Sequence, residues 1–96
     1  MSKLDNHPRA RYQAPVDYPH QARANGTEGS VLLEFLVDEK GNVLSPRIID
    51  SSDATFNEAA LQSIRHWRFE PGRLHGKTVS FKMRLPMSFN INHSDS

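Results

Sequence analysis

The chain has 96 residues, a formal net charge of +1 and no cysteine. This length predicts one domain with short tails, and the near-zero charge provides no field that would attract nucleic acid or an acidic membrane. The absence of cysteine excludes a disulfide or a cysteine zinc site. The longest apolar run, residues 31–37, is broken by Glu34 and is far shorter than the roughly 18–20 residues that cross a bilayer. No secretory leader follows Met1, and we expect a small soluble domain.

The first part of the chain is polar and lacks a hydrophobic period. We predict a flexible lead-in over residues 1–15, a folded domain over residues 16–91 and a disordered tail over residues 92–96. Pro15 and Pro19 favour extended backbone before each of them, and Pro19 also suits a helix start. The following residues, 20–25, predict a short helix that ends at Gly26.

A hairpin is predicted in the middle of the chain. Residues 30–38 alternate between apolar and polar positions, which is typical of a strand. Residues 38–42 provide a turn, with Gly41 available for a left-handed conformation. The next strand, residues 43–50, contains Pro46, which cannot donate to a ladder and therefore indicates an edge strand or a bulge.

The third predicted element is a helix with one apolar stripe. Thr55 and Glu58 form a capping-box pattern at its start, and Pro71 with Gly72 is expected to end it. The stripe consists of Phe56, Ala60, Ile64 and Trp67.

The only tryptophan, Trp67, lies between Arg65 and Arg68. We interpret Trp67 as the last large core residue of the stripe, and the two arginines as solvated charges that complement the helix dipole. Together with Phe69 and Arg73 the same run suggests a nucleic-acid stacking platform. The core position of Trp67 and the low net charge argue against nucleic acid as a partner.

The last strand has the strongest pattern in the chain. Apolar residues alternate without error over residues 79–91, so a strand of up to about 13 residues is predicted, longer than its expected partner, residues 30–38. The fold class is therefore α+β, in the order α-β-β-α-β: an antiparallel three-stranded sheet, a main helix on one face and a short N-terminal helix. The expected core positions on the strands are Val31, Leu33, Phe35, Val37, Phe81, Met83 and Leu85.

Seven short motifs occur in a fixed order between residues 18 and 89. They are Tyr18-Pro19, Glu28-Gly29, the hairpin of residues 37–43, Ser51-Ser52, Ala59-Ala60-Leu61, the Trp67–Pro71 run and Leu85-Pro86-Met87-Ser88-Phe89. No single motif is specific, but together and in register they resemble the TonB C-terminal domain family.

This resemblance implies a periplasmic module of an energy transducer. The family binds outer-membrane TonB-dependent transporters, which import iron chelates, haem or cobalamin. It contacts the plug of the transporter and a short segment at the periplasmic end of the transporter, called the box peptide. An inner-membrane proton-channel complex drives the module through an N-terminal membrane helix and a spacer, which we expect to lie outside this chain. The alternative is a TonB-like interaction domain of a sensor or surface protein with another partner.

The resemblance also places the last strand beside the first, with its outer edge open. An open edge presents main-chain groups that a foreign segment can pair with. Because Pro86 has no N–H, it suits the open side better than the paired side. Without a bulge, the amides of Ser80, Lys82 and Arg84 share that side, and we predict that these four residues form the docking edge. The alternative is that Lys82 and Arg84 are only a solvated strand face.

A second candidate surface lies around the Tyr18-Pro19 motif, which helps to contact the transporter in the family. The matching positions are Gln13, Ala14, Pro15, Tyr18 and Pro19. The alternative is that Tyr18 packs on the sheet. Some family members carry an arginine where this chain has Gln21, so a charge contact there would fall to Arg23 or be lost.

Catalysis finds little support in the sequence. The five histidines show no metal-ligand spacing, and the chain has no glycine-rich phosphate loop. We expect no enzyme activity, no metal and no cofactor. Because the last strand has a bare edge and the first strand carries Leu32 and Leu36 on its second face, a strand-exchanged homodimer is possible.

Overall fold

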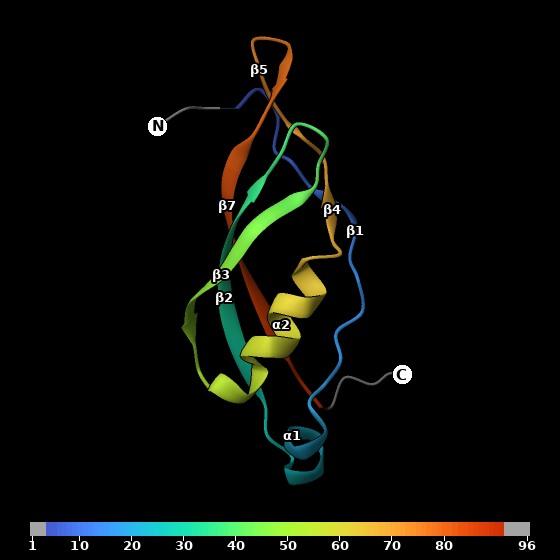
Figure 1. The fold of residues 1–96 in the computed structure, drawn as a ribbon, viewed down its shortest axis with the longest axis vertical. Helices are drawn as coiled ribbons and strands as arrows, with labels where there is room; N and C mark the ends of the chain where they lie inside the picture. Colours follow the sequence, from blue (N-terminus) through green and yellow to red (C-terminus); the bar gives the residue numbers. More distant parts are fainter. Residues whose placement is uncertain (1–3, 92–96) are drawn as a thin grey trace.

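The computed structural model describes residues 4–91 and shows an antiparallel three-stranded sheet (Figure 1). Its strands are β2 (Gly29–Val37), β3 (Val43–Ser51) and β7 (Phe81–Phe89), in the order β3-β2-β7. Helix α2 (Asn57–Ile64) lies on one face, and α1 (His20–Asn25) precedes β2. The remaining elements are β1 (Ala10–Tyr12), η1 (Ala54–Phe56), β4 (Arg68–Phe69), β5 (Gly72–Leu74) and β6 (Lys77–Val79). The predicted α+β class and the order of the main elements are confirmed.

The core lies between α2 and the sheet. Alternate side chains of β2 point into it, and all four expected positions there are at most 2% exposed. The helical stripe is buried against them, with Trp67 at 9%. On β7 the burial is uneven: Met87 and Phe89 are buried, whereas Phe81, Met83 and Leu85 are only partly buried. Among the described residues other than glycine, the buried ones outside the predicted core are Ala14, Ala22, Glu34, Ser63, Phe69, Met87 and Phe89.

The β2–β3 turn forms as predicted. The Asp38 carboxylate accepts hydrogen bonds from the main-chain amides of Lys40 (2.9 Å) and Asn42 (2.8 Å), and those bonds hold the pKa of Asp38 below its ordinary value. Gly41 has φ 90°, and a Cβ there would lie 2.0 Å from the carbonyl oxygen of Phe69. Gly41 is therefore required both by its backbone conformation and by its closeness to β4.

Strand β3 is an edge strand with two irregularities. Its register against β2 shifts between Leu32 and Leu33, and again between Glu34 and Leu36. The second shift faces the stretch that contains Pro46, and Ser45 next to it has φ 51°. The prediction that Pro46 marks an edge strand or a bulge is confirmed.

The end of the main helix differs from the prediction. Helix α2 ends at Ile64, and the amides of His66 and Trp67 close the last turn with bonds to the carbonyls three residues before them. Arg68 belongs to β4, which pairs with β1, so Arg68 is not in the final helical turn and Pro71-Gly72 does not end the helix. Strand pairing of residues 68–69 takes precedence over helix continuation.

The start of the helical region also differs. No capping box forms between Thr55 and Glu58. The Asp53 carboxylate accepts the Thr55 amide at 2.9 Å and caps η1, which leads directly into α2. Glu58 instead accepts a hydrogen bond from the Gln62 side chain, one turn further along α2.

The predicted long strand over residues 79–91 is divided into two. Lys77–Val79 forms β6, which pairs with β5, and β7 begins only at Phe81 and ends at Phe89. All nine residues of β7 pair with β2, so the expectation that this strand outruns its partner is wrong. The alternation continues through both strands because each is extended, and the pattern gives no sign of the break at Ser80.

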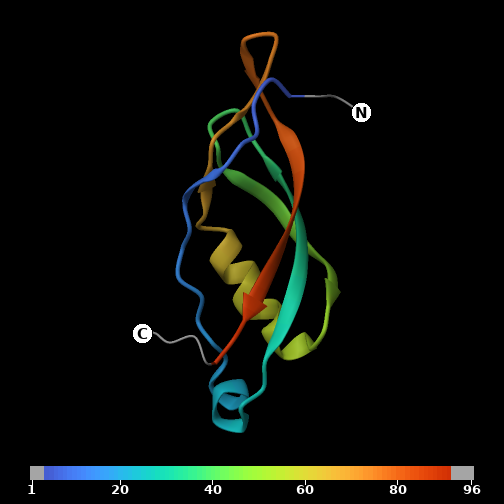
Figure 2. The same ribbon diagram turned by 180° about the vertical axis from the view of Figure 1, so that it is seen from behind.

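Residues 4–15, the described part of the predicted lead-in, contact the rest of the domain. The Asp5 amide donates to the Arg73 carbonyl, and the Asn6 side chain accepts the Arg73 amide. Strand β1 then pairs with β4, and the chain continues alongside α2 (Figures 1 and 2). A three-residue strand leaves no period in a sequence, so composition alone could not predict these contacts. The domain boundaries stay a prediction, and the predicted tail, residues 92–96, lies outside the described residues.

Candidate functional site

One edge of the main sheet is unpaired. Strand β7 is the terminal strand of the order β3-β2-β7, and within residues 4–91 no strand pairs with its outer side. The β2–β7 register continues without a shift from Gly29 opposite Phe89 to Val37 opposite Phe81. Figure 2, seen from behind, shows β7 and β2 in front of α2, so no helix of residues 4–91 covers this face of the sheet.

The main-chain hydrogen bonds at the ends of β2 show which residues point outward. Ser30 directs its amide to the Ser52 hydroxyl and its carbonyl to the Ser52 amide, and the Asp38 amide donates to the Asn42 carbonyl. Both residues therefore face the β3 side. The direction of the main-chain N–H and C=O groups alternates from residue to residue along a regular strand. The main-chain groups of Leu32, Glu34 and Leu36 therefore also point to β3, and those of the residues between them point to β7.

It follows that the residues of β7 opposite this set have main-chain groups that point away from β2. These are Lys82, Arg84, Pro86 and Ser88, and we call their outward main-chain groups the β7 edge. Pro86 lacks an N–H and lies on this side, where no internal ladder bond is lost. All four residues are exposed.

Ser80 differs from the other predicted edge residues. It lies between β6 and β7 and belongs to neither strand. Ser88, which the sequence prediction did not include, has the outward-pointing main-chain groups that were expected for Ser80. The alternation alone could have indicated Ser88, because it continues the series of Lys82, Arg84 and Pro86.

The side chain of Arg84 is held by a buried carboxylate. Its Nε donates to Glu34 Oε2 at 3.0 Å, and Arg47 of β3 donates to the other oxygen of Glu34. The hydrogen bond from Arg84, followed by that from Arg47, lowers the pKa of Glu34, so this carboxyl is charged at neutral pH. Lys82 has no ion pair among the described residues. The two cations thus differ: Arg84 is held in place, whereas Lys82 is solvated.

The second candidate surface is partly committed to the core. Ala14 is buried, and its carbonyl accepts a hydrogen bond from Ser63 at 3.1 Å. The Tyr18 ring packs edge-on against Phe56 and Phe89, and its hydroxyl donates to the Thr27 carbonyl. Of the remaining predicted positions, Gln13, Pro15 and Gln21 are exposed and Pro19 is half-buried.

The structure brings part of this second surface next to the C-terminal end of β7. The centroids of the Tyr18 and Phe89 rings are 5.9 Å apart, so the Tyr18-Pro19 motif lies at the Phe89 end of the strand. The Arg23 guanidinium lies 5.2 Å from the centroid of the Tyr18 ring, where it extends the same surface. Gln21 carries no charge, and Arg23 is the cation nearest to the motif along the chain.

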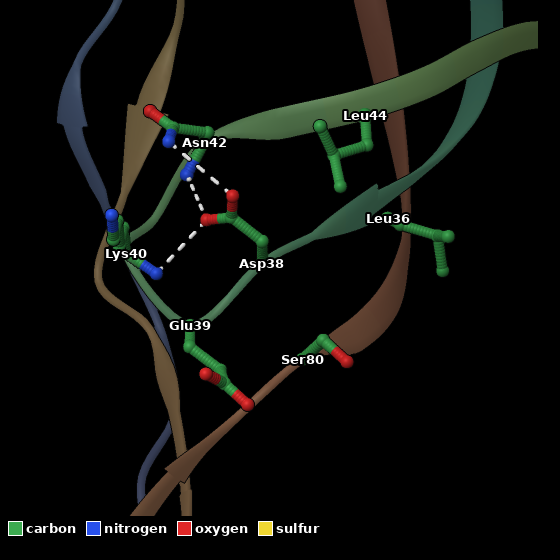
Figure 3. Close-up of a pocket in the computed structure, with 7 residues that line it drawn as sticks. All are labelled: Leu36, Asp38, Glu39, Lys40, Asn42, Leu44 and Ser80. Atoms are coloured by element: carbon green, nitrogen blue, oxygen red, sulfur yellow. Dashed lines mark hydrogen bonds between the residues drawn. The ribbon is translucent and has the colours of Figure 1, made fainter.

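An open hollow of about 390 Å³ lies at the other end of β7, beside the hairpin turn (Figure 3). The exposed side chains of Leu36 and Leu44 line it, together with the Asp38 hydrogen-bond network and Ser80. Apolar surface is therefore exposed next to the first residues of β7.

Two features are absent from the described part of the chain. Residues 4–91 contain no cluster of three or more His, Cys, Asp or Glu side chains arranged to hold a metal ion. None of their helices has the length and apolar character needed to cross a membrane.

Comparison with known proteins gives consistent results over most of the chain. The family described as "Gram-negative bacterial TonB protein C-terminal" matches residues 14–91. The chain is 33% identical over 80 residues to Protein TonB of Vibrio cholerae, covering 82% of this chain and 33% of the relative. It is 37% identical over 79 residues to Protein TonB of Yersinia enterocolitica, covering 79% and 31%. The chain thus spans about a third of the length of the curated relatives it matches.

Two solved structures have the same fold. The solution NMR structure of the Pseudomonas aeruginosa TonB CTD matches with a TM-score of 0.75 and 27% identity, covering 95% of this chain and 93% of the other. The tonb2 protein from Vibrio anguillarum matches with a TM-score of 0.63 and 26% identity, covering 95% and 86%.

Proposed function

Because the chain belongs to the TonB C-terminal domain family, we propose that it is the periplasmic partner-binding domain of a TonB-type energy transducer. In this proposal the domain docks the box peptide of outer-membrane transporters and transmits work derived from an inner-membrane proton-channel complex. The transported substrates would be iron chelates, haem or cobalamin.

The observation that carries this proposal is the β7 edge. Lys82, Arg84 and Ser88 offer outward amides and carbonyls, and Pro86 offers a carbonyl, so an extended peptide placed beside β7 finds a regular set of partners. A uniform ladder of main-chain bonds depends little on the sequence of the peptide. One domain can therefore serve several transporters by the same contact.

The strength of such a contact suits repeated binding and release. Each main-chain hydrogen bond contributes about 0.5–1.5 kcal/mol net. The few bonds that the β7 edge offers must also offset the loss of freedom on association. We therefore expect a weak, reversible complex, and the exposed Gln13, Pro15 and Gln21 would add contacts at the Phe89 end of β7.

The test compares two substitutions at Lys82, whose side chain makes no ion pair in the described part of the chain. Lys82→Pro removes one outward amide without removing a bond to β2, whereas Lys82→Ala keeps the amide and removes the charge. In calorimetric titration with box peptides, we expect Lys82→Pro to bind about 2–10 times more weakly than Lys82→Ala. Equal affinities of two folded variants would argue against docking at the β7 edge.

A further inference from the structure

The β7 edge is flanked by two chemically different rows of side chains. Lys82 and Arg84 lie on the face that carries Glu34, whereas Met83 and Leu85 lie on the face that carries Leu33 and the core. A strand added to an edge continues the sheet, and its side chains alternate between the same two faces. Each face of an incoming segment therefore meets a different row.

The outer row is positively charged, and its charge is only partly compensated. Glu34 is the carboxylate between Arg47 and Arg84, so one negative charge serves two guanidinium groups. The side chain of Arg84 stays 61% exposed although its Nε bonds Glu34. The other acidic residue of the main sheet, Asp50, lies on the far strand β3. The surface beside the β7 edge thus keeps an excess of positive charge.

The inner row is apolar and incompletely covered. Met83 and Leu85 are only partly buried. Their partners on β2 are Phe35, opposite Met83, and Leu33, opposite Leu85, and both partners are almost completely buried. The difference arises because β7 is the last strand of the sheet, and no other strand within residues 4–91 lies on its outer side. An added strand with apolar side chains on this face would remove the remaining surface from water.

We propose that the β7 edge selects an extended partner segment in which acidic and apolar residues alternate. Two acidic side chains, two positions apart, lie beside Lys82 and Arg84, and the apolar residues next to them cover Met83 and Leu85. Glu34 acts as a positioning residue, because its bond to Nε holds Arg84 and leaves the terminal nitrogens available to the partner carboxylate. This inference rests on the proposed strand addition and goes beyond it by assigning the chemistry of the partner.

The test uses three capped peptides that differ only in charge. Each has valine at positions one, three and five, with glutamate, glutamine or lysine at positions two and four. We expect the glutamate peptide to bind about fivefold or more tightly than the lysine peptide at low salt, with glutamine between them. The difference should decrease as salt is added, because these charges are exposed. Shifts of the Lys82 and Arg84 amides in NMR spectra would locate the contact.

A charge reversal at Lys82 provides the matched control. Lys82 makes no bond to Glu34 and acts on it only through its charge, so Lys82→Glu removes neither of the bonds that Glu34 makes, and Lys82→Gln removes the charge without reversing it. Lys82→Glu should lose the preference for the glutamate peptide over the lysine peptide. In Lys82→Gln, the difference in binding free energy between these two peptides should fall to about half of its value in the parent.

The outcomes separate the inference from the proposed function. Equal binding of all three peptides, with shifts at Lys82 and Arg84, would overturn the charge selection and leave strand addition standing. Failure of box peptides and of all three designed peptides to shift these amides would overturn both. Selection of the glutamate peptide that persists unchanged in Lys82→Glu would also overturn the assignment, because the charge would then act elsewhere.

Discussion

Arg84 of β7 and Glu34 of β2 lie directly opposite each other, and their side chains are joined by a 3.0 Å bond from Nε to Oε2. Arg47 bonds the same carboxylate from the other neighbouring strand. The charged group thus connects all three strands of the main sheet on the face opposite α2. It also explains how Glu34 is buried within an otherwise apolar run.

The first prediction concerns the pH dependence of stability. The folded-state pKa of Glu34 is lowered, so its contribution is fully present above the ordinary carboxyl pKa, 4.5, and is lost as pH falls through the lowered folded-state value. Glu34→Gln should therefore be less stable than the parent at pH 7, and the two should converge as the pH falls below 4.5 and through the lowered folded-state pKa of Glu34. Urea unfolding at a series of pH values measures this. A stability difference that is constant from pH 7 to pH 2 would contradict it.

The second prediction concerns the connection between α2 and the N-terminal segment. The Trp67 indole donates to the Ser63 hydroxyl at 3.0 Å, and Ser63 donates to the Ala14 carbonyl. Ser63→Ala leaves both partners without a bond in a buried site, which costs about 1–3 kcal/mol. We expect this loss in urea unfolding, with a red-shifted tryptophan emission if water reaches Trp67. Gln62→Ala, one position away on the exposed side, should lose less than about 0.5 kcal/mol.

The third prediction concerns the hairpin turn. Gly41 has φ 90°, and a Cβ there would meet the Phe69 carbonyl oxygen, which belongs to β4. Gly41→Ala should cost about 2 kcal/mol or more, since it combines left-handed strain with a main-chain clash. Gly76→Ala is the matched control, because Gly76 also has positive φ, 79°, but no described residue other than its two chain neighbours comes within 4 Å of its Cβ position. Equal losses of unfolding free energy for the two variants would show that the clash at Gly41 does not matter.

The fourth prediction concerns self-association. If two copies of the chain exchange strands through the β7 edge, the exposed Leu36 and Leu44 would add apolar contact, and dimerisation would compete with peptide binding. Sedimentation should then show a dimer fraction that rises with protein concentration and falls when box peptide is added. A dimer that box peptide does not change would place the self-association surface elsewhere.

Sequence patterns predicted the elements whose residues repeat over several turns or pleats. The alternation in β2, the stripe that includes Phe56 and Ile64, and the position of Gly41 all describe local geometry that the chain repeats or requires. The short pairings were not predictable, because β1 with β4, and β5 with β6, are only two or three residues long. They also changed two larger predictions, since β4 ends the helix early and the pairing of β6 with β5 leaves Ser80 outside the last strand.

The candidate site was predictable in part for the same reason. The outward direction of the main-chain groups of Lys82, Arg84 and Pro86 follows from alternation along a strand without a bulge, and a sequence contains that information. The cluster around Glu34 depends on the register of three strands at once. The burial of Ala14 depends on a bond to α2 from 49 residues away, which no local pattern contains.

Amide exchange along β7 tests docking at the β7 edge most directly. In the free domain, the Lys82, Arg84 and Ser88 amides should exchange rapidly, whereas those of Met83 and Leu85, which face β2, should be protected. On saturation with box peptide, we expect the first set to slow and the second to change little. Unchanged exchange at Lys82, Arg84 and Ser88 in a saturated complex would contradict strand addition at this edge.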